Sequence, residues 1–249
     1  GIYWELGNEP DLEKYFAGRD LTAIYYTQLM RYHFLNLREA DDNLNFVGGV
    51  VSGGNNAVNT LRYMLAQGGY KYMDGYSYHP YIKAFKVDDR YDSFCAPYEK
   101  VADGYGGWLF RAISEMGWDS QLESGGSVMS YEEAAVEYVK AFLKAYSHDL
   151  EFYTHYSLIN NLGIQTQNDT SIATNGTIAL TFLTKNLNSA VYAGQLELTE
   201  GIQCQMFYSL GEPLLVVWMP GDEPFEYKFN TPVDVYDIYG NLEYTSDTV

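Results

Sequence analysis

The chain has 249 residues, 47% of them hydrophobic, which is enough for one large domain or a medium domain with a small one. The formal net charge is −18, from 33 acidic and 15 basic side chains. Because this charge repels phosphates and anionic surfaces, we expect no nucleic-acid partner and no binding to an anionic membrane. No run of about 18 apolar residues is present, so we expect no membrane-spanning helix in this sequence. The two cysteines, Cys95 and Cys204, are too few for a disulfide scaffold; we expect free thiols, and a bridge between the two is the alternative that the sequence leaves open.

Strand-like and helix-like segments alternate through the first three quarters of the chain. The predicted strands cover residues 2–6, 45–51, 73–78, 109–114 and 151–158. The predicted helices cover residues 21–37, 56–67, 97–102, 131–146 and 175–187, and a long loop is expected after the third strand. The helix over 131–146 has the strongest signal, because Ser130 and Glu133 have the spacing of a capping box. In the helix over 21–37, the spacing predicts a core-facing stripe of Leu21, Ile24, Tyr25, Tyr32 and Leu35.

Repeated strand–helix units predict parallel strands joined by right-handed crossovers. No Gly-x-Gly-x-x-Gly pattern follows any predicted strand, which disfavours a dinucleotide-binding fold. The pattern therefore favours an α/β fold in which the strands form all or part of a (β/α)8 TIM-type barrel.

The last 60 or so residues change character, because short strands alternate there with turn pairs such as Pro220-Gly221 and Gly240-Asn241. This pattern predicts an antiparallel meander that folds as a small β-sandwich. We therefore divide the chain into a partial catalytic barrel over 1–189 and a C-terminal antiparallel β-domain over 190–249.

Polar residues follow the predicted parallel strands at positions where barrel enzymes hold their active sites. Asn8, Glu9 and Pro10 follow the first strand, and His79 and Tyr81 follow the third. The end of the fourth strand is followed by Glu115 and Trp118, and the region of the fifth contains Tyr156.

Two of these segments resemble motifs of the clan A glycoside hydrolases, which are retaining enzymes built on an eight-stranded β/α barrel. The run Trp4-Glu5-Leu6-Gly7-Asn8-Glu9-Pro10 resembles their fourth-strand motif, and Ser114-Glu115-Met116-Gly117-Trp118 resembles the seventh-strand motif that carries their nucleophile. The glutamates are 115 − 9 = 106 residues apart, which leaves room for three β/α units. The segment 76–81 resembles the sixth-strand end of the same clan, and the segment 237–241 resembles the small β-domain that follows many such barrels.

The resemblance implies hydrolysis of O-glycosidic bonds by double displacement, with Glu9 as the general acid/base and Glu115 as the nucleophile. Retaining hydrolysis requires such a pair with carboxyl groups about 5–5.5 Å apart. The implied partner is an oligosaccharide, polysaccharide or glycoside. The side chains implied to bind the sugar or orient the carboxylates are Asn8, His79, Tyr81, Trp118 and Tyr156.

Two alternatives remain open at the level of sequence. Glu123 could be the nucleophile in place of Glu115, although the segment before it, 118–122, is too polar for a buried barrel strand. A non-catalytic carbohydrate-binding relative of the same fold is the alternative to an enzyme. The histidines lack the His-Glu-x-x-His spacing and no phosphate-binding loop is present, so we expect no metal and no cofactor.

Five strands are too few to close an eight-stranded barrel. On the resemblance, three strands should precede Gly1, and the chain is expected to be truncated at its N-terminus. We therefore expect an open sheet whose bare edges are the strands over 2–6 and 151–158, and an isolated chain with weak or no activity.

Overall fold

The computed structural model describes residues 2–15, 22–81, 87–105, 107–117, 130–156, 164–167, 170–219 and 226–248. The chain divides into two compact units. The first comprises Gly1–Lys83, Asp89–Trp118 and Asp149–Tyr156, and the second comprises Ala84–Asp88, Asp119–His148 and Ser157–Val249. The domain boundary between residues 189 and 190 stays a prediction.

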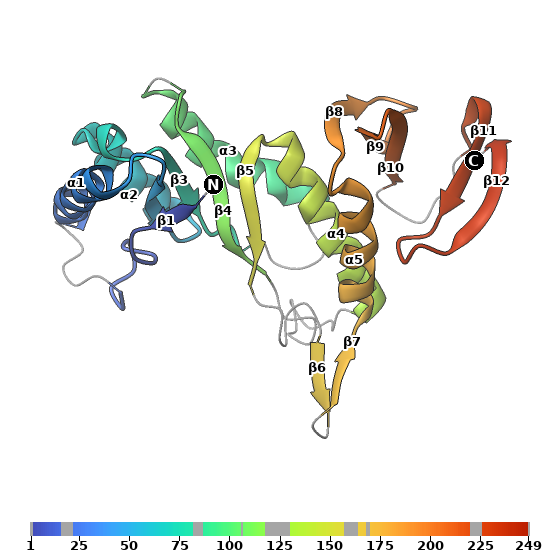
Figure 1. The fold of residues 1–249 in the computed structure, drawn as a ribbon, viewed down its shortest axis with the longest axis horizontal. Helices are drawn as coiled ribbons and strands as arrows, with labels where there is room; N and C mark the ends of the chain where they lie inside the picture. The colour runs from blue at the N-terminus through green and yellow to red at the C-terminus, as the bar shows by residue number, and fades with distance from the viewer. Residues whose placement is uncertain are drawn as a thin grey trace. The chain divides into compact units, whose positions relative to one another are not determined.

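The first unit is built on a five-stranded parallel sheet (Figure 1). Its strands pair in chain order: β1 (Tyr3–Glu5), β2 (Asn45–Val51), β3 (Gly75–Tyr78), β4 (Phe110–Met116) and β5 (Leu150–His155). The sheet is open, with β1 and β5 at its edges, as the sequence predicts. It is also curled, because the ring of Tyr3 lies 5.7 Å from that of Phe110 and 4.9 Å from that of Phe152. The prediction of a partial TIM-type barrel is confirmed.

Three helices alternate with the strands of this sheet, and the third is longer than the sequence predicts. They are α1 (Thr22–Ala40), α2 (Asn55–Ala66) and α3 (Val87–Asp103), with a short 3-10 turn, η2 (Gly69–Tyr72), after α2. The predicted long loop after the third strand is wrong in its second half, because α3 begins at Val87 and not near Pro97. Proline favours the first turn of a helix, so Pro97 misled the prediction, whereas the structure accommodates it inside α3.

The predicted core-facing stripe of α1 is also wrong. Ile24, Tyr25, Tyr32 and Leu35 are between 43% and 65% exposed, and Leu21 lies outside the described residues. The buried face is instead the one that carries Tyr26 and Met30. Strand β2 accommodates this face at Gly48, because a Cβ added there would lie only 2.6 Å from the sulfur of Met30. The missing side chain of Gly48 therefore makes the room that Met30 occupies.

Asp74 connects three elements of the first unit at the start of β3. Its carboxylate accepts a hydrogen bond of 2.7 Å from the backbone N–H of Phe46 and a bidentate pair from the guanidinium of Arg38 in α1. Arg38 and Asp74 are each only 25% exposed, so water competes weakly for these bonds.

Replacing Asp74 with alanine should lower the free energy of unfolding by about 2 kcal/mol, because several charge-assisted hydrogen bonds are lost and Phe46 N–H is left unpaired. Urea denaturation of the chain measures this. Asp103→Ala is a matched control, because Asp103 pairs with Arg111 at 3.1 Å but is 54% exposed, and its loss should cost less than about 1 kcal/mol. Equal effects of the two substitutions would contradict the prediction.

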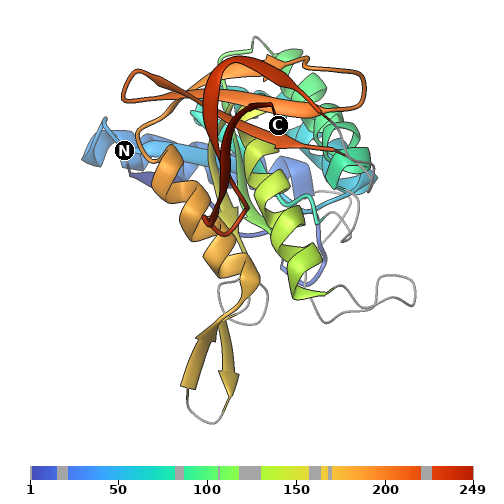
Figure 2. The same ribbon diagram turned by 90° about the vertical axis from the view of Figure 1, so that its right-hand side faces the viewer.

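In the described residues of the second unit, there are two helices, two antiparallel sheets and a hairpin. Helices α4 (Tyr131–Ser147) and α5 (Asn175–Leu187) pack side by side, and β6 (Ile164–Gln167) and β7 (Thr170–Ala173) form a hairpin beyond them (Figure 2). The larger sheet has the order β10-β9-β8, from β8 (Val191–Leu196), β9 (Gln203–Ser209) and β10 (Glu212–Trp218). The smaller pairs β11 (Lys228–Tyr236) with β12 (Leu242–Thr248). The prediction of a small antiparallel β-domain after the partial barrel is confirmed.

The local sequence patterns of this unit predict one helix cap correctly but do not predict all of its strands. The capping box is present, since Glu133 N–H donates to the Ser130 hydroxyl at 3.1 Å and Ser130 N–H donates to the Glu133 carboxylate at 2.7 Å. The sequence does not predict the hairpin β6–β7 or the strand β12. It predicts separate short strands over 226–229 and 233–238, whereas the structure has one strand there, β11, with a register shift between Lys228 and Val233. Cys204 in this unit and Cys95 in the first are buried free thiols. Within the described ranges, no helix combines the length and the apolar character needed to span a bilayer.

Candidate active site

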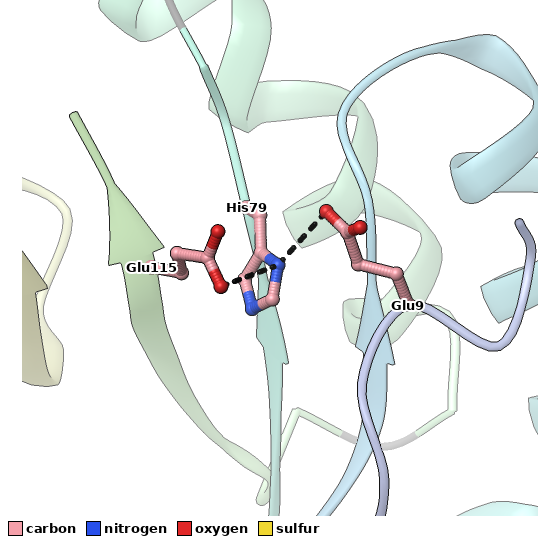
Figure 3. Close-up of side chains that lie close together, drawn as sticks. All are labelled: Glu9, His79 and Glu115. Atoms are coloured by element: carbon pink, nitrogen blue, oxygen red, sulfur yellow. Dashed lines mark hydrogen bonds and ion pairs between the residues drawn. The ribbon is translucent and has the colours of Figure 1, made fainter. Parts of the chain in front are cut away.

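Two carboxylates of the first unit converge on one histidine (Figure 3). Glu9 lies in the loop after β1, His79 directly follows β3, and Glu115 lies near the end of β4. The Nδ1 atom of His79 is 3.1 Å from Oε1 of Glu9 and 3.8 Å from Oε2 of Glu115. One oxygen of each carboxylate and one ring nitrogen of His79 all lie within 4.8 Å of one another. The parallel topology brings these distant residues together because the carboxyl ends of the strands meet at one edge of the sheet.

Glu9 is held in a restricted backbone position. Its φ is +43°, in the left-handed region that costs a residue with a Cβ about 1–2 kcal/mol. The loop is fixed by the Leu12 N–H, which donates to the Glu9 carbonyl at 2.9 Å, and by Gly7, whose φ is +71°. The side chain of Glu9 is 9% exposed, and its Oε2 lies 4.0 Å from Nζ of Lys14. A buried carboxyl on a strained backbone is typical of a functional position.

Glu115 is more accessible, with 24% of its side chain exposed. The hydroxyl of Tyr81 donates a hydrogen bond to its Oε1. Burial, followed by this hydrogen bond, raises the pKa of Tyr81 well above its ordinary value of 10. Tyr81 therefore remains a proton donor to Glu115 throughout the ordinary pH range.

The second ring nitrogen of His79, Nε2, contacts a series of residues to which the sequence analysis assigns no role. His79 Nε2 lies 3.1 Å from the hydroxyl of Ser114, which donates to the hydroxyl of Ser77 at 3.2 Å. Ser77 in turn donates to a carboxylate oxygen of Glu5 at 2.6 Å. The sequence pattern that could have indicated Ser77 is the two-residue alternation of a strand. Ser77 in β3 and His79 directly after it are two residues apart, so their side chains point to the same side of the extended backbone.

The remaining predicted site residues differ in how far the structure places them. Asn8 is half-buried beside Glu9 in the same loop. Tyr156 is 53% exposed, and its backbone N–H donates to the carbonyl of Met116 at 2.8 Å, which holds it next to the end of β4. Trp118 and the rival nucleophile Glu123 lie outside the described residues.

The glycine of the second motif has a steric reason. A Cβ added at Gly117 would lie 1.8 Å from the carbonyl oxygen of Tyr156 and 3.2 Å from Nε2 of His155. Only a residue without a side chain allows β4 and β5 to approach this closely just beyond Glu115.

His155 makes the stability of the chain depend on pH. Burial lowers the pKa of His155 to about 4, whereas an unfolded histidine has a pKa of about 6.5. Between these values the unfolded state binds more protons, so the contribution is fully present above about pH 6.5 and is lost as the pH falls to about 4. The loss should be about 3 kcal/mol at most.

Urea denaturation at about pH 7.5 and about pH 4.5 measures this contribution, with His155→Gln as the comparison. The native chain should lose more stability over this range than the variant does. An identical loss in both would exclude His155 as the source.

The same three groups are the candidate for a metal site within the part of the chain that the structure describes. Glu9, His79 and Glu115 each offer one ligand atom. Two of these residues also make hydrogen-bonding contacts with the protein, because Nδ1 of His79 faces Oε1 of Glu9 and Oε1 of Glu115 accepts from Tyr81.

Neither a family model nor a curated protein matches the sequence. Solved structures do. A Paenibacillus polymyxa xyloglucanase from glycoside hydrolase family 44 matches with a TM-score of 0.65 and 11% identity, over 100% of this chain and 62% of that one. The GH39 enzyme from Xanthomonas axonopodis pv. citri matches with a TM-score of 0.56 and 13% identity, over 82% of this chain and 45% of that one. The catalytic domain of GH30 xylanase C from Talaromyces cellulolyticus has a TM-score of 0.55 and 13% identity, over 92% and 49%.

These likenesses show the fold of the chain, which it shares with part of each of these glycoside hydrolase structures. The resemblance to the clan A enzymes that the motifs indicate is confirmed at the level of fold. The chain spans between 45% and 62% of the length of these three structures.

Proposed function

We propose that this chain carries the catalytic pair of a retaining glycoside hydrolase, with Glu9 as the general acid/base and Glu115 as the nucleophile. The observation that carries the proposal is the convergence of the two carboxylates on His79, with one oxygen of each within 4.8 Å of the other. Retaining enzymes need their carboxyl groups about 5–5.5 Å apart, whereas inverting enzymes separate them by about 6.5–9.5 Å to admit a water molecule. The catalytic part would be the barrel portion over 1–189, and the β-domain over 190–249 would follow it.

In the first step, a carboxylate oxygen of Glu115 attacks the anomeric carbon of the sugar. The bond from that carbon to the leaving oxygen breaks, and the proton of Glu9 passes to this oxygen, so that an alcohol departs. The product is an ester between the sugar and Glu115. Tyr81 holds the Glu115 carboxylate in position through its hydrogen bond.

In the second step, a water molecule attacks the same carbon from the face that the alcohol left. Glu9 takes the proton of the water, and the ester bond to Glu115 breaks, which regenerates both carboxyl groups. Two inversions give net retention. Asn8 would bind the sugar 2-hydroxyl, where hydrogen bonds strengthen in the transition state, and Trp118 and Tyr156 would line the sugar subsite.

The stereochemistry of hydrolysis tests this proposal. The assay uses the longest natural polypeptide that contains these 249 residues, with aryl xylosides and glucosides first, because xylanase, xyloglucanase and glucosidase structures share the fold. Proton NMR of the first-formed sugar should show the anomeric configuration of the substrate. Inversion would contradict the proposal, and saccharide binding without turnover would favour a carbohydrate-binding relative.

A further inference from the structure

Both ring nitrogens of His79 have partners, and the ring itself is 1% exposed. Nδ1 faces Glu9 at 3.1 Å, and Nε2 faces the hydroxyl of Ser114 at 3.1 Å. A neutral imidazole carries one proton, so one of these nitrogens donates and the other accepts. The hydrogen-bonding partners of Nε2 determine which nitrogen carries the proton.

The direction of the hydrogen bonds follows from counting protons along the chain of hydroxyls. An ionised carboxylate only accepts, so Ser77 must give its single hydroxyl proton to Glu5, at 2.6 Å. Ser77 can then only accept from Ser114, at 3.2 Å, and this uses the single proton of Ser114. The hydroxyl of Ser114 therefore has only a lone pair to offer His79.

We infer that Glu5, Ser77 and Ser114 form a relay that fixes His79 as the tautomer protonated at Nε2, so that Nδ1 presents a lone pair to Glu9. The opposite tautomer would require Ser114 to donate to His79, and two hydroxyl oxygens without a proton between them would then face each other. With Nδ1 as an acceptor, the hydrogen bond to Glu9 uses the proton of Glu9. Glu5, Ser77 and Ser114 are thus positioning residues that act through His79.

The consequence for catalysis rests on the proposed function. A lone pair at Nδ1 accepts from the carboxyl group that the proposed function makes the general acid, so the ring orients that carboxyl through one hydrogen bond. The charged groups around this pair are Glu115, 3.8 Å from Nδ1, and Lys14, 4.0 Å from the second oxygen of Glu9.

The tautomer is measured directly by two-bond nitrogen–proton correlation NMR of the 249-residue chain labelled with ¹⁵N-histidine, at about pH 7.5, above the ordinary histidine pKa. The resonances of His79 are those lost in His79→Gln. We expect a pyrrole-type shift for Nε2 and a pyridine-type shift for Nδ1. A pyridine-type Nε2 in the native chain would overturn the inference.

Variants then test the relay itself. Ser114→Ala removes the acceptor of Nε2–H, and we expect the tautomer ratio to move toward Nδ1–H by about tenfold, the value of one ordinary hydrogen bond. Ser114→Thr keeps the hydroxyl and should preserve the native spectrum. Ser93→Ala is the matched control, because the Ser93 hydroxyl is exposed and donates to the carbonyl of Arg90 within α3.

Glu5→Gln covers the case in which Ser114→Ala does not fold, because Glu5 is exposed and its replacement leaves the core intact. An amide can donate to Ser77 as well as accept, so the direction of the relay is no longer forced and the Nδ1–H population should rise. Unchanged ratios in both Glu5→Gln and Ser114→Ala would overturn the relay.

Activity and NMR separate the two proposals. If the relay and the proposed function both hold, Ser114→Ala lowers kcat for glycosides with poor leaving groups, which need the general acid, and changes it little for aryl groups that leave without a proton. The Nε2–H tautomer without glycosidase activity would refute the proposed function and leave the relay standing. Retaining hydrolysis with the Nδ1–H tautomer would refute the relay alone.

Discussion

Replacing Glu115 with alanine is expected to lower the turnover of an activated aryl glycoside on the order of 10⁴-fold or more, because no other group can form the sugar ester. The substitution leaves a small space beside the anomeric carbon. Added azide should enter this space and attack the carbon directly, which restores turnover and gives a glycosyl azide of inverted configuration. The rate of aryl release with and without azide measures the effect.

Glu123→Ala is the matched comparison for this prediction, because Glu123 is the rival nucleophile in the same stretch of sequence. It should keep most of the native turnover and gain nothing from azide. Rescue at Glu123→Ala with none at Glu115→Ala would transfer the nucleophile to Glu123 and refute the assignment made from the geometry around His79.

Glu9→Ala should show a different pattern, set by the leaving group of the substrate. General acid catalysis contributes about 10²- to 10⁴-fold, so glycosides with poor leaving groups should lose that much. An aryl group that leaves without a proton should keep a fast first step and accumulate the ester on Glu115. Azide then attacks this ester without needing a general base, and gives a glycosyl azide of retained configuration.

Glu13→Ala serves as the control for Glu9, because Glu13 is an exposed glutamate in the same loop. Its replacement should change turnover little for any leaving group. If Glu9→Ala lowered turnover equally for good and poor leaving groups, Glu9 would not be the general acid.

Much of the fold could be predicted because its signals are local. The strand β2 and the helix α5 were predicted with the bounds that the structure has, since one is a continuous apolar run and the other a compact helical segment between turns. The cap of α4 is a contact between residues three apart, Ser130 and Glu133, so the sequence contains all of it.

The predictions of helix faces and bounds fail where residues distant in the sequence determine the structure. The face that α1 buries depends on Gly48 in another element, and the apolar periodicity of α1 carries no information about that glycine. The helix predicted to begin at Pro97 begins ten residues earlier, at Val87, and continues through the proline in the folded chain.

The candidate site likewise contains residues that could be predicted from the sequence and residues that could not. Glu9, His79 and Glu115 could be found because each follows or ends a predicted strand in a segment that resembles a known motif. The contacts of Ser77 and Ser114 could not, because they depend on the alignment of β1, β3 and β4, which no single segment specifies. In the sequence alone, Ser77 and Ser114 cannot be distinguished from ordinary polar residues of a strand.

The central claim is that Glu9 and Glu115 act as a retaining pair, and trapping the sugar ester tests it most directly. In a 2-deoxy-2-fluoro glycoside, fluorine destabilises the oxocarbenium-like transition states of both steps. A good leaving group speeds only the first step, so the ester forms faster than water releases it and accumulates. Mass spectrometry of the digested protein then locates the label. We predict one sugar on the peptide that contains Glu115, and none in Glu115→Ala. A label on Glu123, or turnover of natural substrate with no label on any carboxylate, would contradict the account.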